Sequence, residues 1–141
     1  MTAEAAQERL VAQRRNRPLA PHLEIYKWEY VSVTSAMHRI TGVMLAGGLY
    51  TFATLYLIAP ALGLHLESAP MAEAFGSLPL VVKTALKFGV SFPFTYHGFN
   101  GLKHLVYDTG HLMSKTNSGR ASYIVLACSV SASLGLALYK F

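Results

Sequence analysis

Long uncharged stretches dominate the chain and alternate with short charged segments. Ile40 to Leu64 and Ala121 to Tyr139 contain no Asp, Glu, Lys or Arg. At 1.5 Å per residue these stretches form helices of roughly 28 to 37 Å, which is enough to cross a hydrocarbon core about 30 Å thick. The pattern therefore predicts two helices that span a membrane and face its lipid.

A shorter uncharged stretch, Phe88 to Leu102, lies between these two. A helix of that length rises only roughly 22 Å. Lys87 and Lys103 flank it, and their methylene stems can lie along lipid or protein while the ammonium groups reach a headgroup layer. Residues Lys83 to Asp108 are therefore predicted to form a third span.

The expected fold class is all-α, an integral membrane protein with three transmembrane helices at about residues 36–64, 83–108 and 120–140. A short N-terminal helical or extended segment, residues 1–30, precedes a transmembrane anchor domain, residues 31–141. Composition agrees, since 52% of the residues are hydrophobic and 13% are charged. A soluble helical bundle is the alternative, but a chain of 141 residues cannot cover this much uncharged surface with a polar exterior.

Basic residues are distributed unevenly between the connections. The first connection, residues 65–82, contains Glu67 and Glu73 and no Lys or Arg. The positive-inside rule therefore places the N-terminus and the second connection on the matrix or cytoplasmic side. The basic residues before the first span and in the second connection are Arg9, Arg14, Arg15, Arg17, Lys27, Arg39, Lys115 and Arg120.

The net charge of +5 comes mostly from residues beside membrane ends, so we expect membrane lipid and no nucleic acid as a partner. The tail from Thr2 to Arg17 contains Glu4 and Glu8 and has no apolar core. These features do not fit an intact signal or transit peptide. The tail is expected to lie at the surface or to contact a soluble partner.

Ionisable side chains inside the middle span mark a candidate functional site. His97, Gly101, His104 and Asp108 follow at steps of four, three and four, so they fall on one face of a helix. A neutral imidazole at this depth, beside a glycine that leaves room for a flat ring, suits axial ligation of haem iron. The alternative is a histidine that only hydrogen-bonds a neighbouring helix.

The two histidines of this face cannot both bind one iron. They project from the same side about 10 Å apart along the axis, whereas axial ligands approach a porphyrin from opposite sides. His97 is therefore the expected iron ligand, and His104 and Lys103 lie at the polar boundary, where they can donate charge-assisted hydrogen bonds to haem propionates.

A second polar cluster opens the first span. Ser35, His38 and Arg39 lie within about one helical turn, where they can hydrogen-bond a quinone carbonyl and stabilise the charge that develops on reduction. The alternative is a helix start with Ser35 as the N-cap and Arg39 reaching the headgroups. Gly42 and Ala46, one turn apart, indicate a helix-packing face.

Three motifs in this order resemble the cytochrome b large membrane-anchor subunit of succinate dehydrogenase, respiratory complex II. The resemblance extends from about Arg17 to the C-terminus. The motifs are Arg17-Pro18-Leu19-Ala20-Pro21-His22-Leu23-Glu24-Ile25-Tyr26, Ser35-x2-His38-Arg39-x-Thr41-Gly42 and His97-x3-Gly101-x-Lys103-His104-x3-Asp108. The run Lys87-Phe88-Gly89-x2-Phe92-Pro93-x2-Tyr96-His97 further resembles the mitochondrial members from animals.

The resemblance implies that His97 is an axial ligand of haem b and that Ser35 and Arg39 line a ubiquinone site. Lys103 occupies a position that is commonly arginine in the family, and it keeps the charge but loses the bidentate fork. The expected cofactor-binding residues are His97, His38, Arg39, Lys103 and His104.

The resemblance also implies three partners: a small cytochrome b anchor subunit with the second haem ligand, an iron–sulfur subunit and a flavoprotein subunit. Flavin and iron–sulfur clusters are expected in these partners only, because the lone Cys128 cannot hold a cluster. No catalysis is expected from this chain alone. The implied location is the mitochondrial inner membrane with the N-terminus in the matrix, or a bacterial plasma membrane as the alternative.

Two other functions remain open. The chain can be a structural membrane scaffold whose histidines only pack helices, or a dihaem cytochrome b subunit of another respiratory complex. The number of haems bound per chain separates these two alternatives from a subunit that shares one haem.

Overall fold

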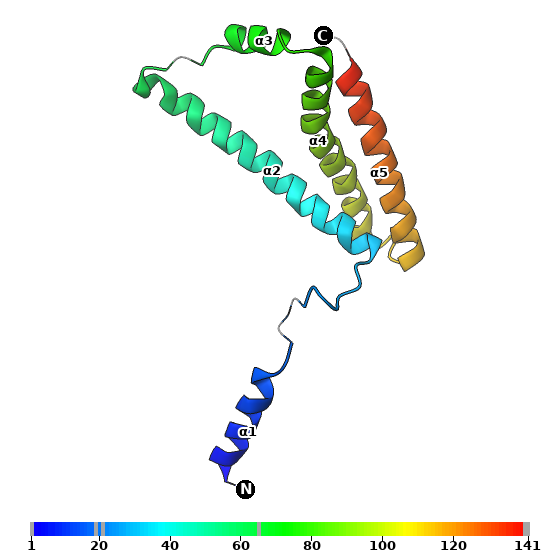
Figure 1. Ribbon diagram of the computed structural model, residues 1–141. Helices are drawn as coiled ribbons and strands as arrows, with labels where there is room; N and C mark the ends of the chain where they lie inside the picture. Colours follow the sequence, from blue (N-terminus) through cyan, green and yellow to red (C-terminus); the bar gives the residue numbers. More distant parts are fainter. Residues whose placement is uncertain (1, 19, 21, 65, 140–141) are drawn as a thin grey trace.

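Figure 1 shows the computed structural model of the chain, which describes residues 2–18, 20, 22–64 and 66–139. The described residues form helices and no strand, which confirms the all-α class. Leu19 and Pro21 of the first motif, His65 of the first connection and Lys140 at the end of the third predicted span lie outside the described residues. The elements are α1 (Ala3–Arg15), α2 (Tyr30–Ile58), the 3-10 helix η1 (Ala59–Leu62), α3 (Ser68–Gly76), α4 (Leu80–Asp108) and α5 (Lys115–Leu138).

Each predicted span corresponds to one long helix, but every helix begins earlier than predicted. α2 begins at Tyr30 instead of residue 36, α4 at Leu80 instead of 83, and α5 at Lys115 instead of 120. The prediction marked the residues at lipid depth. A helix can continue beyond that depth into the polar layer on either side of the hydrocarbon core.

Local signals explain where the helices stop and start. Pro60 lies in η1 directly after α2, and Gly63 then turns the chain with a φ of +73°, a conformation that glycine adopts without strain. Ser114 caps α5, since its hydroxyl accepts a hydrogen bond from the Asn117 N–H at 3.3 Å. The short helix α3 in the first connection was not predicted.

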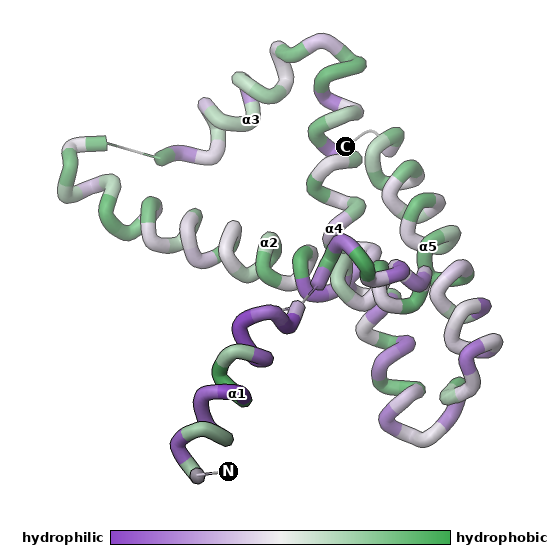
Figure 2. The backbone as a smooth tube through the Cα atoms, turned by 60° about the horizontal axis from the view of Figure 1, so that its bottom comes forward, coloured by the Kyte–Doolittle hydropathy of each residue, from purple (hydrophilic) through white to green (hydrophobic). Residues whose placement is uncertain are grey.

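Two of the described helices are long and apolar enough to cross a membrane: α2 together with η1, and α5. α4 is as long as α2, with 29 residues, but it contains more charged and polar positions. Figure 2 shows the contrast between the largely hydrophobic α2 and the hydrophilic α1. A third crossing by α4 therefore stays a prediction.

The three long helices meet at one end, which we call the converging end and define by Tyr30, Asp108 and Lys115. α4 and α5 lie side by side, whereas α2 meets them only at its beginning and then diverges (Figure 1). Lys115 forms an exposed ion pair with Glu29 at 2.8 Å at this end. All predicted site residues belong to the first half of α2 or the second half of α4.

Buried serines form the contact between α4 and α5. Ser122, Ser129 and Ser133 are 0–1% exposed. The Ser129 and Ser133 hydroxyls donate to backbone carbonyls one turn earlier at 2.7 Å, and the Thr95 hydroxyl of α4 lies 2.7 Å from that of Ser133. Small residues allow such close approach of membrane helices.

The serine contact predicts a stability effect. Ser133→Leu is expected to lower the melting temperature of the detergent-solubilised protein, because overpacking a close contact costs about 1–3 kcal/mol. Ser131→Leu is the matched control, since Ser131 is exposed on the same helix. Equal melting temperatures for the two variants would contradict the packing described.

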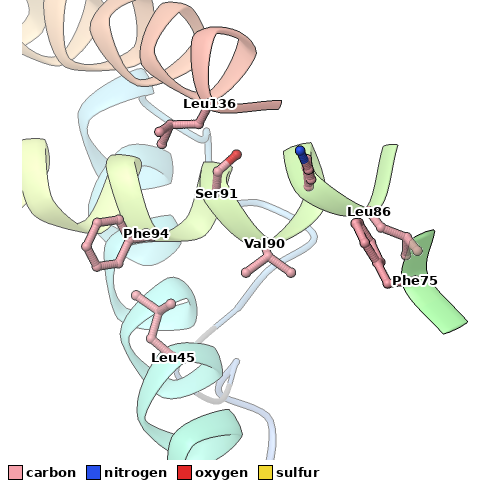
Figure 3. A pocket seen from close by; sticks show the side chains of 8 residues that line it. Leu45, Phe75, Leu86, Val90, Ser91, Phe94 and Leu136 are labelled. Atoms are coloured by element: carbon pink, nitrogen blue, oxygen red, sulfur yellow. The ribbon is translucent and has the colours of Figure 1, made fainter. Parts of the chain in front are cut away.

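An apolar cavity of about 450 Å³ opens where α2 diverges from the other helices (Figure 3). Leu45 of α2 lies opposite Val90 and Phe94 of α4, and Leu136 lines the α5 side. The remaining lining residues are Phe75, Leu86, Lys87 and Ser91. No predicted site residue lines this cavity, so the candidate site must be sought at the converging end.

Candidate functional site

Three histidines from two helices stack at the converging end. The His38 ring of α2 lies 4.2 Å from the His97 ring, with the two planes 13° apart. The same ring lies 4.9 Å from the His104 ring, with the planes 27° apart. One ring of α2 thus contacts two rings of α4, which confirms that His97 and His104 share a face of their helix.

The His97 ring is oriented by the backbone of α2. Its Nδ1 lies 3.0 Å from the His38 carbonyl oxygen and 3.4 Å from the Thr41 hydroxyl oxygen. Because a carbonyl can only accept, Nδ1 of the neutral ring carries the proton and Nε2 keeps its lone pair. The stacked His38 covers one face of this ring, and no hydrogen bond with another described residue engages Nε2, so the geometry fits an axial ligand.

Two buried nitrogens beside His97 lack a hydrogen-bond partner within the described part of the chain. They are Nδ1 of His38 and Nε2 of His104. Buried polar atoms in folded proteins nearly always have partners. Both positions therefore fit a bound group with hydrogen-bonding substituents, such as the propionates of a haem.

The surface of α4 at Gly101 is open. A Cβ atom added there meets no other side chain or distant backbone within 4 Å. The described residues contain no group of three or more His, Cys, Asp or Glu that could hold a bare metal ion.

The Lys103 ammonium contacts α5. Lys103 is 6% exposed, its Nζ donates to the Ser122 hydroxyl of α5 at 3.0 Å, and it lies 5.6 Å from the Tyr107 ring centroid. Its ammonium thus belongs to the contact between α4 and α5. The propionate contact assigned to Lys103 stays a prediction, and it requires the ammonium to leave Ser122.

Ser35 and Arg39 lie on α2 on either side of His38 in the sequence, Ser35 partly buried and Arg39 exposed. Ser35 lies in the second turn of a helix that begins at Tyr30, so the alternative in which it caps the helix is wrong. Neither side chain forms a hydrogen bond with another described residue. The quinone-site role assigned to both residues therefore stays a prediction.

The sequence analysis missed a second layer of polar contacts between α2 and α4. The Tyr96 hydroxyl donates to the Thr34 carbonyl at 2.9 Å, and the Asn100 amide donates to the same oxygen at 3.4 Å. Asn100 is 0% exposed, and its Oδ1 has no partner among the described residues. A polar residue at this depth was the available signal, but its partner lies 66 positions away in the sequence.

Comparisons with known proteins identify the family. A family model described as succinate dehydrogenase/fumarate reductase transmembrane subunit matches residues 13–136. The chain is 42% identical to the mitochondrial succinate dehydrogenase cytochrome B subunit of Schizosaccharomyces pombe, over 92% of this chain and 72% of the relative. It is 37% identical to the mitochondrial succinate dehydrogenase cytochrome b560 subunit of Sus scrofa, over 86% of this chain and 70% of the relative. It is 34% identical to the succinate dehydrogenase cytochrome b556 subunit of Paracoccus denitrificans, over 83% of this chain and 86% of the relative. The chain therefore belongs to the family of succinate dehydrogenase and fumarate reductase transmembrane subunits.

Proposed function

We propose that this chain is the cytochrome b anchor subunit of succinate dehydrogenase in the mitochondrial inner membrane, where it co-ligates one haem b and helps to form the site of ubiquinone reduction. One observation carries the proposal. The Nδ1 of His97 is fixed on the His38 carbonyl at 3.0 Å, which leaves Nε2 for iron. The cytochrome b560 and b556 names of the relatives support a haem b.

In this proposal the chain crosses the membrane three times, with α4 as the middle crossing. A helix of 29 residues rises roughly 43 Å, which exceeds the hydrocarbon thickness. Three polar residues of α4 are buried within the chain, since Asn100 is 0% exposed, Lys103 6% and Thr95 8%. Residues 1–30 and the connection between α4 and α5 face the matrix by the positive-inside rule.

Haem b is held in this proposal by residues of both helices. His97 would bind the iron through Nε2, and the small anchor subunit would supply the second histidine ligand. His38 and His104 would donate to the propionates, with Arg39 and Lys103 as further contacts. When bound, haem b supplies a one-electron redox centre at this depth.

The quinone site uses the exposed donors of α2. The Ser35 hydroxyl and the Arg39 guanidinium donate hydrogen bonds to one carbonyl oxygen of ubiquinone and stabilise the negative charge that reduction places there. Two electrons come from the iron–sulfur subunit, which the flavoprotein feeds by oxidising succinate. With two protons they convert ubiquinone to ubiquinol.

Reduced-minus-oxidised spectra of the purified complex test the proposal. We expect one haem b for each copy of this chain, because the chain offers one axial ligand. The absence of a haem band would favour a structural scaffold whose histidines only pack helices. Two haems for each copy would favour a dihaem cytochrome b of another complex.

A further inference from the structure

Residues 38–42 of α2 contact the His97 ring at several points. The His38 carbonyl and the Thr41 hydroxyl oxygen both lie near Nδ1, at 3.0 and 3.4 Å. The His38 ring covers one face at 4.2 Å. Gly42, which follows Thr41, lies against the ring edge. Three closely spaced positions of α2 therefore contact one side chain of α4.

The Thr41 hydroxyl has a single proton and several neighbours. Thr41 is 2% exposed, and its oxygen lies 2.9 Å from the Met37 carbonyl and 2.9 Å from the His38 carbonyl. When the proton is donated to Met37, the His38 carbonyl stays free for the Nδ1–H of His97. The hydroxyl oxygen then serves as a second, longer acceptor for that same N–H. Thr41 thereby favours the ring form with its proton on Nδ1.

Gly42 fixes the position of the ring. A Cβ atom added at Gly42 would lie 2.8 Å from Cε1 of His97 and 3.3 Å from Nδ1. Carbon atoms that are not bonded do not approach to 2.8 Å, so any side chain here displaces the ring or separates α2 from α4. The ring cannot move far without losing the 3.0 Å contact with His38, which lies one turn earlier on the same helix.

We propose that Thr41 and Gly42 are positioning residues for the axial ligand, Thr41 by holding the proton on Nδ1 and Gly42 by leaving room for the ring. The inference rests on the proposed role of His97 as an iron ligand. Partners of the nitrogen that does not bind metal set the ring form and raise the basicity of a ligating histidine. A more basic ligand stabilises ferric over ferrous haem, so Thr41 is expected to lower the haem midpoint potential.

Substitutions at Thr41 test the hydrogen bond in the assembled complex. Thr41→Val keeps the shape and removes the acceptor, while Thr41→Ser keeps the hydroxyl. For Thr41→Val we expect the preference for ferric over ferrous haem to fall by roughly two- to tenfold, which raises the midpoint potential by about 20–60 mV at 59 mV per tenfold. Thr41→Ser is expected to keep the parent potential, as measured by redox titration of the haem band.

Gly42→Ala tests the space for the ring. Haem content for each assembled complex is expected to fall by roughly tenfold, the lower end of the effect of outer partners on metal affinity. Gly47→Ala is the matched control, because it is the same change on the same helix and its Cβ meets nothing within 4 Å. It is expected to keep the parent haem content.

The outcomes separate this inference from the proposed function. Identical potentials for Thr41→Val, Thr41→Ser and the parent, or full haem content in Gly42→Ala, would overturn the positioning roles. If Gly42→Ala yields no assembled complex, the Thr41 pair alone decides. Full haem content in His97→Ala would overturn the proposed function itself. Loss of haem in His97→Ala, together with an unchanged midpoint potential in Thr41→Val, would overturn only the inference about Thr41.

Discussion

His97→Ala is expected to remove haem b from the assembled complex. The geometry of this imidazole fits an axial ligand, with Nδ1 bound to the His38 carbonyl at 3.0 Å. Loss of an outer partner alone costs 10–100-fold in metal affinity, so loss of the ligand itself is expected to cost at least roughly 100-fold. The measurement is haem content for each mole of purified complex.

A second histidine gives the matched control for this experiment. His111 is exposed, and its Nδ1 lies 2.9 Å from the Thr109 hydroxyl in the connection after α4. His111→Ala is expected to keep the parent haem content and spectrum. An unchanged haem band in His97→Ala would show that the iron is held by other residues.

Ser35→Ala and Arg39→Ala are expected to suppress ubiquinone reduction while succinate oxidation with an artificial acceptor continues. Each substitution removes a donor to the oxygen on which charge develops, and loss of one such donor typically costs roughly 100-fold or more in rate. The two rates are measured on the same preparation. Their ratio separates the quinone step from the flavoprotein.

Arg120→Ala is the control for the loss of a basic residue. Arg120 is exposed on α5, a helix that carries none of the proposed site residues, and its removal is expected to leave both rates unchanged. Haem content is measured for each variant, because Arg39 is also assigned to haem binding. An equal fall of both rates in Ser35→Ala and Arg39→Ala would point to failed assembly and contradict a specific quinone role.

The one-sided arrangement of the histidines was predictable from local sequence. The spacing of His97 and His104 follows from helical geometry alone, and the stacking of both rings on His38 confirms it. The all-α class was equally predictable, because uncharged stretches of this length leave few alternatives. The family was predictable from three motifs that occur in the right order.

Contacts between helices were not predictable, because they depend on which faces meet across long sequence separations. Lys103 was expected at a headgroup layer with its ammonium toward a propionate, yet its Nζ donates to Ser122 of α5. Gly42 was predicted to pack against a helix. The structure shows that Gly42 packs against α4, where it meets the imidazole of His97. No local sequence pattern identifies that partner.

The relatives refine the resemblance drawn from the motifs. The run around Phe92 and Pro93 resembles animal members, but identity is 42% to the fungal relative and 37% to the pig relative. A short run of residues is therefore a weaker guide to the group within a family than the whole chain. The shared motifs still identify the family in both cases.

Most of α2 exposes apolar side chains. Val43 is 73% exposed, Tyr50 70% and Leu57 77%. Such a surface is stable where lipid or another apolar helix covers it. The proposed small anchor subunit satisfies this requirement, since the same partner that supplies the second haem ligand can cover α2 where it diverges from α4.

The central claim is that His97 of this chain shares one haem with a histidine of a companion subunit. A structure of the intact complex tests it most directly. We predict bonding distance between the iron and Nε2 of His97, with Nδ1 still on the His38 carbonyl and a partner histidine on the opposite side. Iron ligated wholly by other residues, or a His97 ring turned toward lipid, would contradict the account.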